Sequence, residues 1–116
     1  MSAYTGNYIH LIADFSGVSA EELRDTNLLA GLLVAAAGAA GLTAVGTPLV
    51  RRLPSNMVSG VLLLDGCHMS VHAVPDRGIL MLDVLSLSTY DARKALDVFA
   101  RRLTAGEIRS EQRSRG

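Results

Sequence analysis

The chain has 116 residues, which suffice for one domain with a small core but not for two. Its formal charge is zero, so the composition gives no reason to expect nucleic acid or an anionic membrane as a partner. A single cysteine, Cys67, excludes an internal disulfide and a cysteine-rich zinc module, and it favours a reducing, cytoplasmic location. The first residues lack the basic and apolar regions of a secretory signal.

The first part of the chain predicts a strand and then a long buried helix. Tyr8–Phe15 alternates between two faces, as a half-buried strand does. Ser19 and Glu22 form a capping box, in which the Ser19 hydroxyl accepts from the Glu22 amide and the Glu22 side chain reaches back. The helix that begins there is expected to run to about Ala40.

The segment Thr26–Val50 carries no charge and is long enough for a membrane span. Gly41, a typical helix stop, and Pro48 interrupt its second half. A buried helix followed by a strand explains these breaks, so no membrane association is expected.

Four further segments have the pattern of strands: 42–52, 58–64, 69–74 and 79–87. Pro75–Gly78 predicts a turn between the last two, because proline presets φ and glycine closes the turn. The strand after that turn is so apolar, apart from Asp83, that both of its faces should be covered.

The end of the chain predicts an amphipathic helix capped by Ser88 and ending near Gly106. From about residue 107 the basic, polar tail is expected to be flexible. This order of elements indicates a single α+β domain over residues 1–116, with an antiparallel sheet and two helices on one face. The other face needs a partner, so we expect a homodimer that forms through the sheets.

Chemically active residues cluster between Ser59 and Asp83. Gly66, Cys67 and His68 interrupt an apolar strand, and His72 follows four residues after His68, on the same strand face. Each residue also has a purely structural explanation. A lone thiol is often a small hydrophobe, and a buried aspartate or histidine is often a hydrogen-bonded core group.

The segment Ser59–Gly78, followed by Asp83, resembles the self-cleaving site of the prokaryotic S-adenosylmethionine decarboxylases. The family pattern is S-G, a hydrophobic strand, E-S-H, I-H-T-W-P-E, a glycine, and later an aspartate followed by a cysteine. The spacing matches without a gap. Residues 10–15 also resemble the family's first strand. The resemblance implies a four-stranded antiparallel sheet with two helices, and a dimer in which two sheets meet.

In that family a serine attacks the carbonyl of the preceding residue, the resulting ester eliminates, and the new N-terminus becomes a pyruvoyl group. This cofactor forms a Schiff base with the substrate amine and acts as the electron sink for decarboxylation. The resemblance therefore implies that Cys67 is the pyruvoyl precursor and that Ser59 stabilises the tetrahedral intermediate. It gives His72 the removal of the α-proton and makes His68 a further catalytic candidate.

The resemblance also implies a substrate-binding set. Asp76 stands where a family glutamate holds the ribose, Leu53 lies near the position of an aromatic ring that would stack on adenine, and Asp14 belongs to the matching first strand. The expected partner is a small amine. It is S-adenosylmethionine, as in spermidine and other polyamine biosynthesis, or a related amino acid such as arginine or ornithine.

Three of the departures from the family pattern bear directly on cleavage and proton transfer. Cys67 replaces serine, which is chemically permissible because a thiolate is the better nucleophile. Gly66 replaces the acid and loosens the turn. Leu87 stands where the family has its proton-donating cysteine, so another group (Ser86, Ser88, His68 or water) must supply that proton.

Two alternatives therefore stay open. Beside the pyruvoyl-dependent decarboxylase, the open interpretations are an unprocessed, inactive paralogue that acts as a binding or regulatory partner of an active homologue, and an enzyme whose intact Cys67 thiol is the nucleophile beside a histidine base. A metal site at His68, His72 and Cys67 is not expected, because no further ligand pair has metal-binding spacing.

Overall fold

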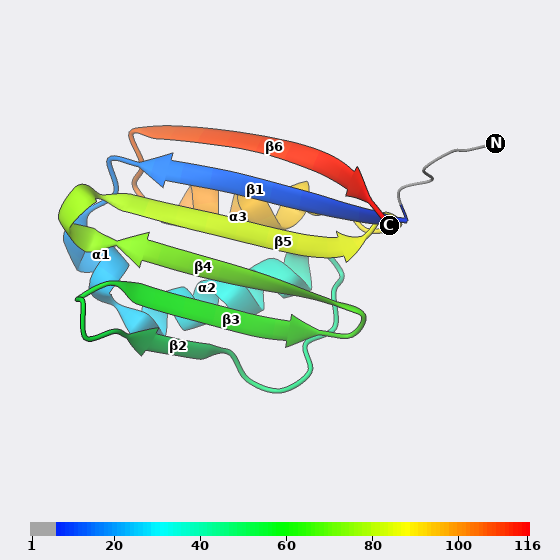
Figure 1. Cartoon of the computed structure of the whole chain (residues 1–116), viewed down its shortest axis with the longest axis horizontal. Helices are drawn as coiled ribbons and strands as arrows, with labels where there is room; N and C mark the ends of the chain where they lie inside the picture. The colour runs from blue at the N-terminus through cyan, green and yellow to red at the C-terminus, as the bar shows by residue number, and fades with distance from the viewer. Residues whose placement is uncertain (1–6) are drawn as a thin grey trace.

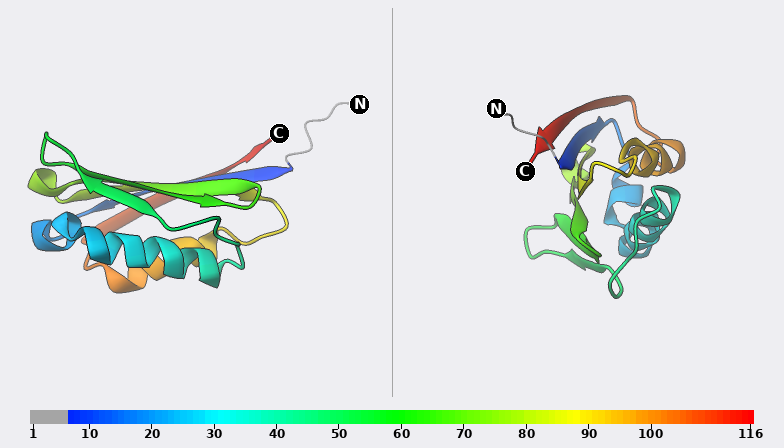
Figure 2. Two further views of the ribbon diagram at one scale, coloured as in Figure 1. Left: turned by 90° about the horizontal axis from the view of Figure 1, so that it is seen from below. Right: turned by 90° about the vertical axis from the view of Figure 1, so that its right-hand side faces the viewer.

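Six strands form one antiparallel sheet in the order β2-β3-β4-β5-β1-β6, and the helices lie on one side of it (Figures 1 and 2). This computed structural model describes residues 7–116. The first residues, which were predicted to lack a secretory signal, lie almost entirely outside the described residues. In chain order the elements are β1 (Tyr8–Ser16), α1 (Ala20–Arg24), α2 (Thr26–Ala39), β2 (Leu49–Arg52), β3 (Val58–Leu64), β4 (Cys67–Val74), the 3-10 turn η1 (Pro75–Arg77), β5 (Ile79–Leu87), α3 (Arg93–Arg102) and β6 (Glu107–Arg115).

The α+β class and the antiparallel sheet are confirmed, whereas the four strands and two helices that the resemblance implies are wrong. Residues 7–116 contain six strands and three α-helices. The segment predicted as a strand over 42–52 pairs continuously only at Leu49–Arg52, with a single bridge between Ala44 and Leu64 before it. Gly46, with φ at 89°, lies between the two and turns the chain away from the sheet.

The long predicted helix is divided at Asp25. This residue ends α1 and caps α2, because its extended backbone (φ −82°, ψ 93°) breaks the helix while its carboxylate accepts from the Leu28 amide at 2.9 Å. The Ser19 cap is confirmed, with the Glu22 amide donating to its hydroxyl at 3.1 Å. The Glu22 side chain does not reach back, since it accepts from Arg102 and from the Thr104 amide instead. Of the helices in the described range, none has the combination of length and hydropathy needed to cross a bilayer.

The C-terminal tail was expected to be flexible, and instead it forms β6. This strand pairs with β1 along its whole length, from Ser16 opposite Glu107 to Tyr8 opposite Arg115. All nine of its residues are exposed, so no hydrophobic alternation announces it in the sequence. The strand is held by backbone hydrogen bonds to a neighbour that is far away in the sequence.

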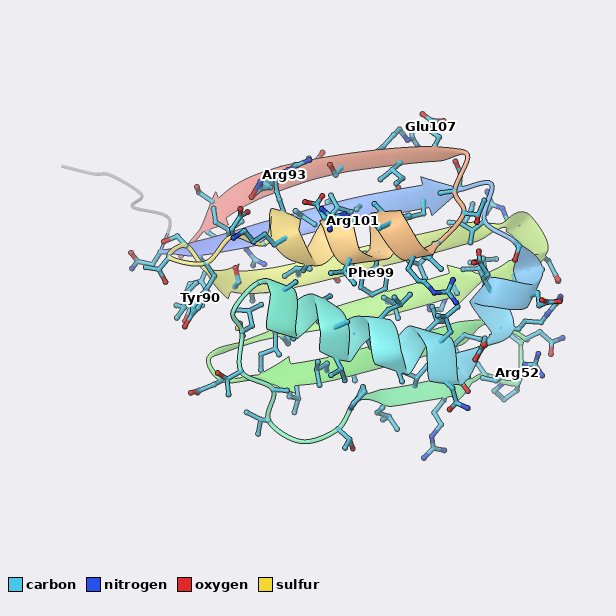
Figure 3. The ribbon with its side chains drawn as sticks, turned by 180° about the vertical axis from the view of Figure 1, so that it is seen from behind. Arg52, Tyr90, Arg93, Phe99, Arg101 and Glu107 are labelled. Carbon is cyan, nitrogen blue, oxygen red and sulfur yellow. The ribbon has the colours of Figure 1, made fainter. Side chains whose placement is uncertain are left out.

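The last helix starts later than expected. Ser88 does not cap it; the structure places the start at Arg93, whose amide donates to the Asp91 carboxylate at 3.1 Å. Helix α3 then lies beside α2 across the sheet, with Phe99 directed into the layer between (Figure 3). The Phe99 ring lies 6.4 Å from that of Phe15 on β1, and both side chains are fully buried.

Side chains on successive strand positions alternate between the helix layer and a face that no element of residues 7–116 covers. We call this second surface the open face. Its side chains include His10, Ile12, Asp14, Ser59, Val61, Leu63, His68, Ser70, His72, Met81, Asp83 and Leu85. The prediction that both faces of β5 are covered is therefore met only on the side of the helices. On the open face of a single chain Met81 remains 40% exposed.

Gly60 on β3 is fixed by close packing. A Cβ atom at this position would lie 2.8 Å from Val50 and 3.3 Å from Val71. Gly60→Ala should therefore lower the free energy of unfolding by about 1–3 kcal/mol, as overpacking does. Gly31→Ala is the control: nothing lies within 4 Å of that position on α2, so it should be neutral or stabilise by up to about 1 kcal/mol. Urea unfolding of both variants measures the difference, and equal effects would contradict the packing argument.

Candidate functional site

Polar side chains from adjacent strands gather on the open face. The prediction that His68 and His72 share one strand face is confirmed, since both belong to the open-face positions of β4. The β3–β4 register places Ser59 directly opposite His72, and the β4–β5 register places Ser70 opposite Asp83. The open face thus carries polar side chains among exposed apolar ones, whereas the other side of the sheet is apolar.

Ser59 and His72 form a hydrogen-bonded pair. The Ser59 hydroxyl oxygen lies 3.2 Å from His72 Nδ1. When His72 Nδ1–H donates to this hydroxyl, the imidazole is neutral and Nε2 keeps a free lone pair, which is the form that a general base needs. The two predicted catalytic residues therefore act on one another, and each is only partly buried.

A hollow of about 330 Å³ lies beside Ser59 and contains the predicted contact residue Leu53. Its lining is formed by Leu49, Arg51, Leu53, Ser59, Gly60, Val61 and Ser70. Apolar side chains supply most of the wall, and Arg51 supplies its one charge. This lining suits a ligand with a flat or apolar portion and a few polar atoms.

Cys67 lies on the opposite side of the sheet from the Ser59–His72 pair. It starts β4, pairs with buried Leu64, and packs partly against the helix-side core. Its thiol donates to the Asp65 carbonyl at 3.6 Å. Burial raises the pKa of the Cys67 thiol, the Asp65 carboxylate raises it further, and a hydrogen bond from the Leu87 backbone lowers it by less. The group is consequently a protonated thiol at neutral pH, not an activated thiolate.

The bond before Cys67 lies in a tight turn. Gly66 has φ at 80°, a conformation that residues with a Cβ rarely adopt, so the acid of the family pattern would be strained here. A Cβ on Gly66 would meet Leu87 Cδ1 at 4.0 Å. Leu87 therefore lies at the Gly66–Cys67 turn, and the position that the resemblance reserves for a proton donor holds an apolar side chain.

The structure does not bring all predicted site residues together. Cys67 and His72 are five residues apart on one extended strand, which is roughly 16 Å along the sheet, and they face opposite sides. Asp76 on η1 is highly exposed and accepts from Arg24 at 3.1 Å. Asp14 lies away from the hollow beside Ser59, in a second hollow of about 300 Å³ between β1 and β6. The predicted site residues thus lie in several places, with Ser59 and Leu53 lining one hollow and Cys67, Asp76 and Asp14 away from it.

Sequence reasoning missed a polar network on the open face. Arg115 Nη1 donates to His10 Nδ1 at 3.2 Å, so the His10 proton lies on Nε2 and is donated to Asp83, whose other oxygen accepts from Ser70 at 3.1 Å. One member of this network stands out in the sequence, since Asp83 interrupts an apolar run. Arg115 could not be found, because the tail was taken to be flexible. Among residues 7–116, no group of three or more metal-ligating side chains comes together.

Comparison with known proteins gives a consistent result. A family model described as S-adenosylmethionine decarboxylase matches residues 9–116. The S-adenosylmethionine decarboxylase proenzyme of Symbiobacterium thermophilum is 33% identical over 96 residues, covering 82% of this chain and 72% of that protein. The proenzyme of Archaeoglobus fulgidus is 26% identical over 108 residues, covering 92% and 96%. The crystal structure of adenosylmethionine decarboxylase from Aquifex aeolicus superimposes with a TM-score of 0.84 at 27% identity, covering 96% of this chain and 92% of that one.

Proposed function

Because the chain belongs to the S-adenosylmethionine decarboxylase family, we propose that it is the precursor of a pyruvoyl-dependent decarboxylase that cuts itself between Gly66 and Cys67. Its substrate is S-adenosylmethionine or a related amino acid. The observation that carries the proposal is the position of Cys67, immediately after a positive-φ glycine at the tip of the β3–β4 hairpin. There the carbonyl to be attacked is held by a turn and not by the sheet.

Each bond change in the cleavage has a group in this chain. Cys67 Sγ bonds to the Gly66 carbonyl carbon, the peptide C–N bond breaks, and the nitrogen takes up a proton as the amine of residue 67. A base then removes the Cys67 α-proton, and the Cβ–S bond breaks to leave Gly66 as a thiocarboxylate and residue 67 as dehydroalanine. Addition of water and loss of ammonia give the pyruvoyl group. When present, that group supplies the electron-withdrawing carbonyl for decarboxylation.

Within one chain His72 lies roughly 16 Å along the sheet from Cys67, so it cannot remove the Cys67 α-proton. We therefore propose that His72, held by Ser59, acts on Cys67 of a second copy, in a homodimer formed by two open faces. The polar and exposed apolar side chains of the open face support this arrangement, because two copies would bury them together. The dimer also gives Met81 and Ile12 the cover that one chain lacks.

Action between copies predicts complementation. His72→Ala and Cys67→Ala should each stay uncut alone, because one lacks the base and the other the nucleophile. Co-expressed with different tags, the pair should show cleavage of the His72→Ala chain only, using His72 of the Cys67→Ala chain. Intact mass spectrometry of the purified mixture measures this. Cleavage of His72→Ala alone at the parent rate would exclude His72 as the base, and an uncut mixture would exclude action between copies.

A second function is favoured by one observation, which is the leucine at the turn. With Leu87 in place of a proton donor and a thiol whose pKa is raised, the chain is also suited to remain uncut and to pair with an active homologue. A single intact mass after long incubation distinguishes this function from the first. The third possibility, an intact Cys67 nucleophile activated by a histidine of the same chain, has less support, because His68 and His72 of that chain belong to the other face.

A further inference from the structure

Within residues 7–116, no second strand pairs with the outer edge of β6 along Glu107–Arg113. Within the described residues β6 pairs with β1 alone, over nine residues without proline and without a break in register. Such edges present free N–H and C=O groups that recruit another strand, and proteins usually shorten or block them. The opposite edge follows that rule, since β2 has four residues and carries Arg51 and Arg52, two charges of one sign.

From Glu107 to Arg113 the charges on β6 alternate in sign, and Arg115 adds a second positive charge at the end of the strand. Glu107, Arg109, Glu111 and Arg113 occupy every second position and share the side of the sheet that carries the open face. In the described part of the chain none of these four forms an ion pair. The two glutamates lie opposite Ser16 and Ile12 of β1, so neither has a cation on the neighbouring strand.

Alternation of this kind makes β6 complementary to a second β6. In a symmetric antiparallel pair, cross-strand partners must share a face, so the symmetry axis passes through a residue. An axis at Ser110 places Arg109 opposite Glu111 and Glu107 opposite Arg113, each pair occurring twice. An axis at Arg109 or at Glu111 sets that residue against its own copy, and an axis at Gln112 sets Arg109 against Arg115. Only the register centred on Ser110 places each of the four charges opposite a charge of the other sign.

We propose that β6 is an interface with a second copy of this chain, in which the two sheets join edge to edge in the register centred on Ser110. The strand is ready for this role because its end is anchored, with Arg115 donating to His10 on β1 at 3.2 Å. Glu107 lies at the outer edge of the sheet, away from the place where α2 and α3 meet (Figure 3). The interface leaves both open faces free, so it is additional to the dimer proposed above and does not depend on it.

The rival explanation is that the charges only protect the edge from other strands. Protection needs no particular order of signs, whereas the proposed pairing does. Glu107→Arg and Arg113→Glu separate the two explanations, because each change alone places like charges opposite one another twice in the Ser110 register. Combined, one variant against the other, they restore every opposite-charge pair. Neither residue touches Cys67, Ser59 or His72.

The experiment is light scattering after size exclusion, over a range of concentration and salt. The parent should show an association step that doubles the mass. This step should weaken towards about 1 M salt, where the distance over which charges act falls to about 3 Å. Each single variant should lose that step, with self-association weaker on the order of tenfold or more, and an equimolar mixture should regain it. Arg101→Glu, the same charge change on the exposed side of α3, should behave as the parent.

A parent without the association step would overturn the proposal. So would single variants that keep the parent mass, or a mixture that fails to recover it. Circular dichroism verifies that each variant keeps its sheet. If one does not, Glu111→Arg with Arg109→Glu tests the same register by the same mixing. Because the readout is mass and not cleavage, failure here leaves the proposed decarboxylase function intact, and failure of cleavage leaves this interface intact.

Discussion

Cys67→Ala should remain a single intact chain under conditions in which the parent protein is cut between Gly66 and Cys67. Alanine has no atom that can attack the Gly66 carbonyl, so both cleavage and pyruvoyl formation should be abolished. The parent should give an N-terminal fragment ending at Gly66 and a C-terminal fragment that resists Edman degradation, because a pyruvoyl end has no amine. Borohydride with an amine substrate should attach that substrate to the C-terminal fragment of the parent only.

Cys67→Ser is the matched variant that keeps a nucleophile. It should still be cut, more slowly, because a hydroxyl is a weaker nucleophile than a thiolate. The fragments also differ chemically: the parent should release Gly66 as a thiocarboxylic acid, and the serine variant should release it as a carboxylic acid. Mass spectrometry resolves sulfur from oxygen at this terminus. A carboxylic acid from both, formed before any hydrolysis, would contradict attack by the thiol.

The pH dependence follows from the raised pKa of the Cys67 thiol. Burial and the Asp65 carboxylate disfavour the thiolate, so the reactive fraction is small at neutral pH and grows as pH approaches the pKa. Cleavage should therefore accelerate with rising pH. Asp65→Asn removes the negative charge, lowers the thiol pKa, and should accelerate cleavage at neutral pH. A parent that stays whole at every pH, with a thiol that titrates with maleimide, would reject the pyruvoyl proposal.

Leu87→Cys should raise the rate of decarboxylation by the processed protein by about 10²-fold or more, within the range that a positioned general acid supplies. Leu87 is the side chain nearest to a Cβ built at Gly66, so a thiol there would lie beside residue 67 and could donate the proton that leucine cannot. Release of carbon dioxide from carboxyl-labelled S-adenosylmethionine measures the gain. Arginine and ornithine serve as alternative substrates.

Leu85→Cys is the control for this gain. It adds the same thiol two positions away on β5, opposite His68 and away from the turn, and should leave the rate unchanged. An equal gain in both variants would mean that the thiol acts without positioning. No gain in Leu87→Cys, with cleavage complete, would show that another group already donates the proton or that protonation is not limiting.

The reach of the sequence is clearest where short-range chemistry decides the structure. The Ser19 cap, the turn at Pro75–Gly78 and the common face of His68 and His72 depend on residues within a few positions of one another, and all three appear in the structure. The opposite faces of Cys67 and His72 were also readable, because five is an odd spacing on a strand. This difference in face changes where the proposed base must come from.

Other features needed the tertiary structure. Asp25 could as easily continue a helix as cap one, and its choice depends on α1 and α2 each packing separately. Arg115, His10, Asp83 and Ser70 come from four strands, so only the strand order puts them in one network.

By itself the sequence determined the family motif around Gly66 and Cys67 and the two sides of the inner strands, because period and spacing are written in neighbouring residues. Only the tertiary structure decided that the charged tail is a strand. Its nine side chains bury nothing, so hydrophobic pattern carries no signal for it. What holds it is a ladder of backbone hydrogen bonds to β1. Every residue except proline carries the same backbone N–H and C=O groups, so the sequence does not mark this pairing.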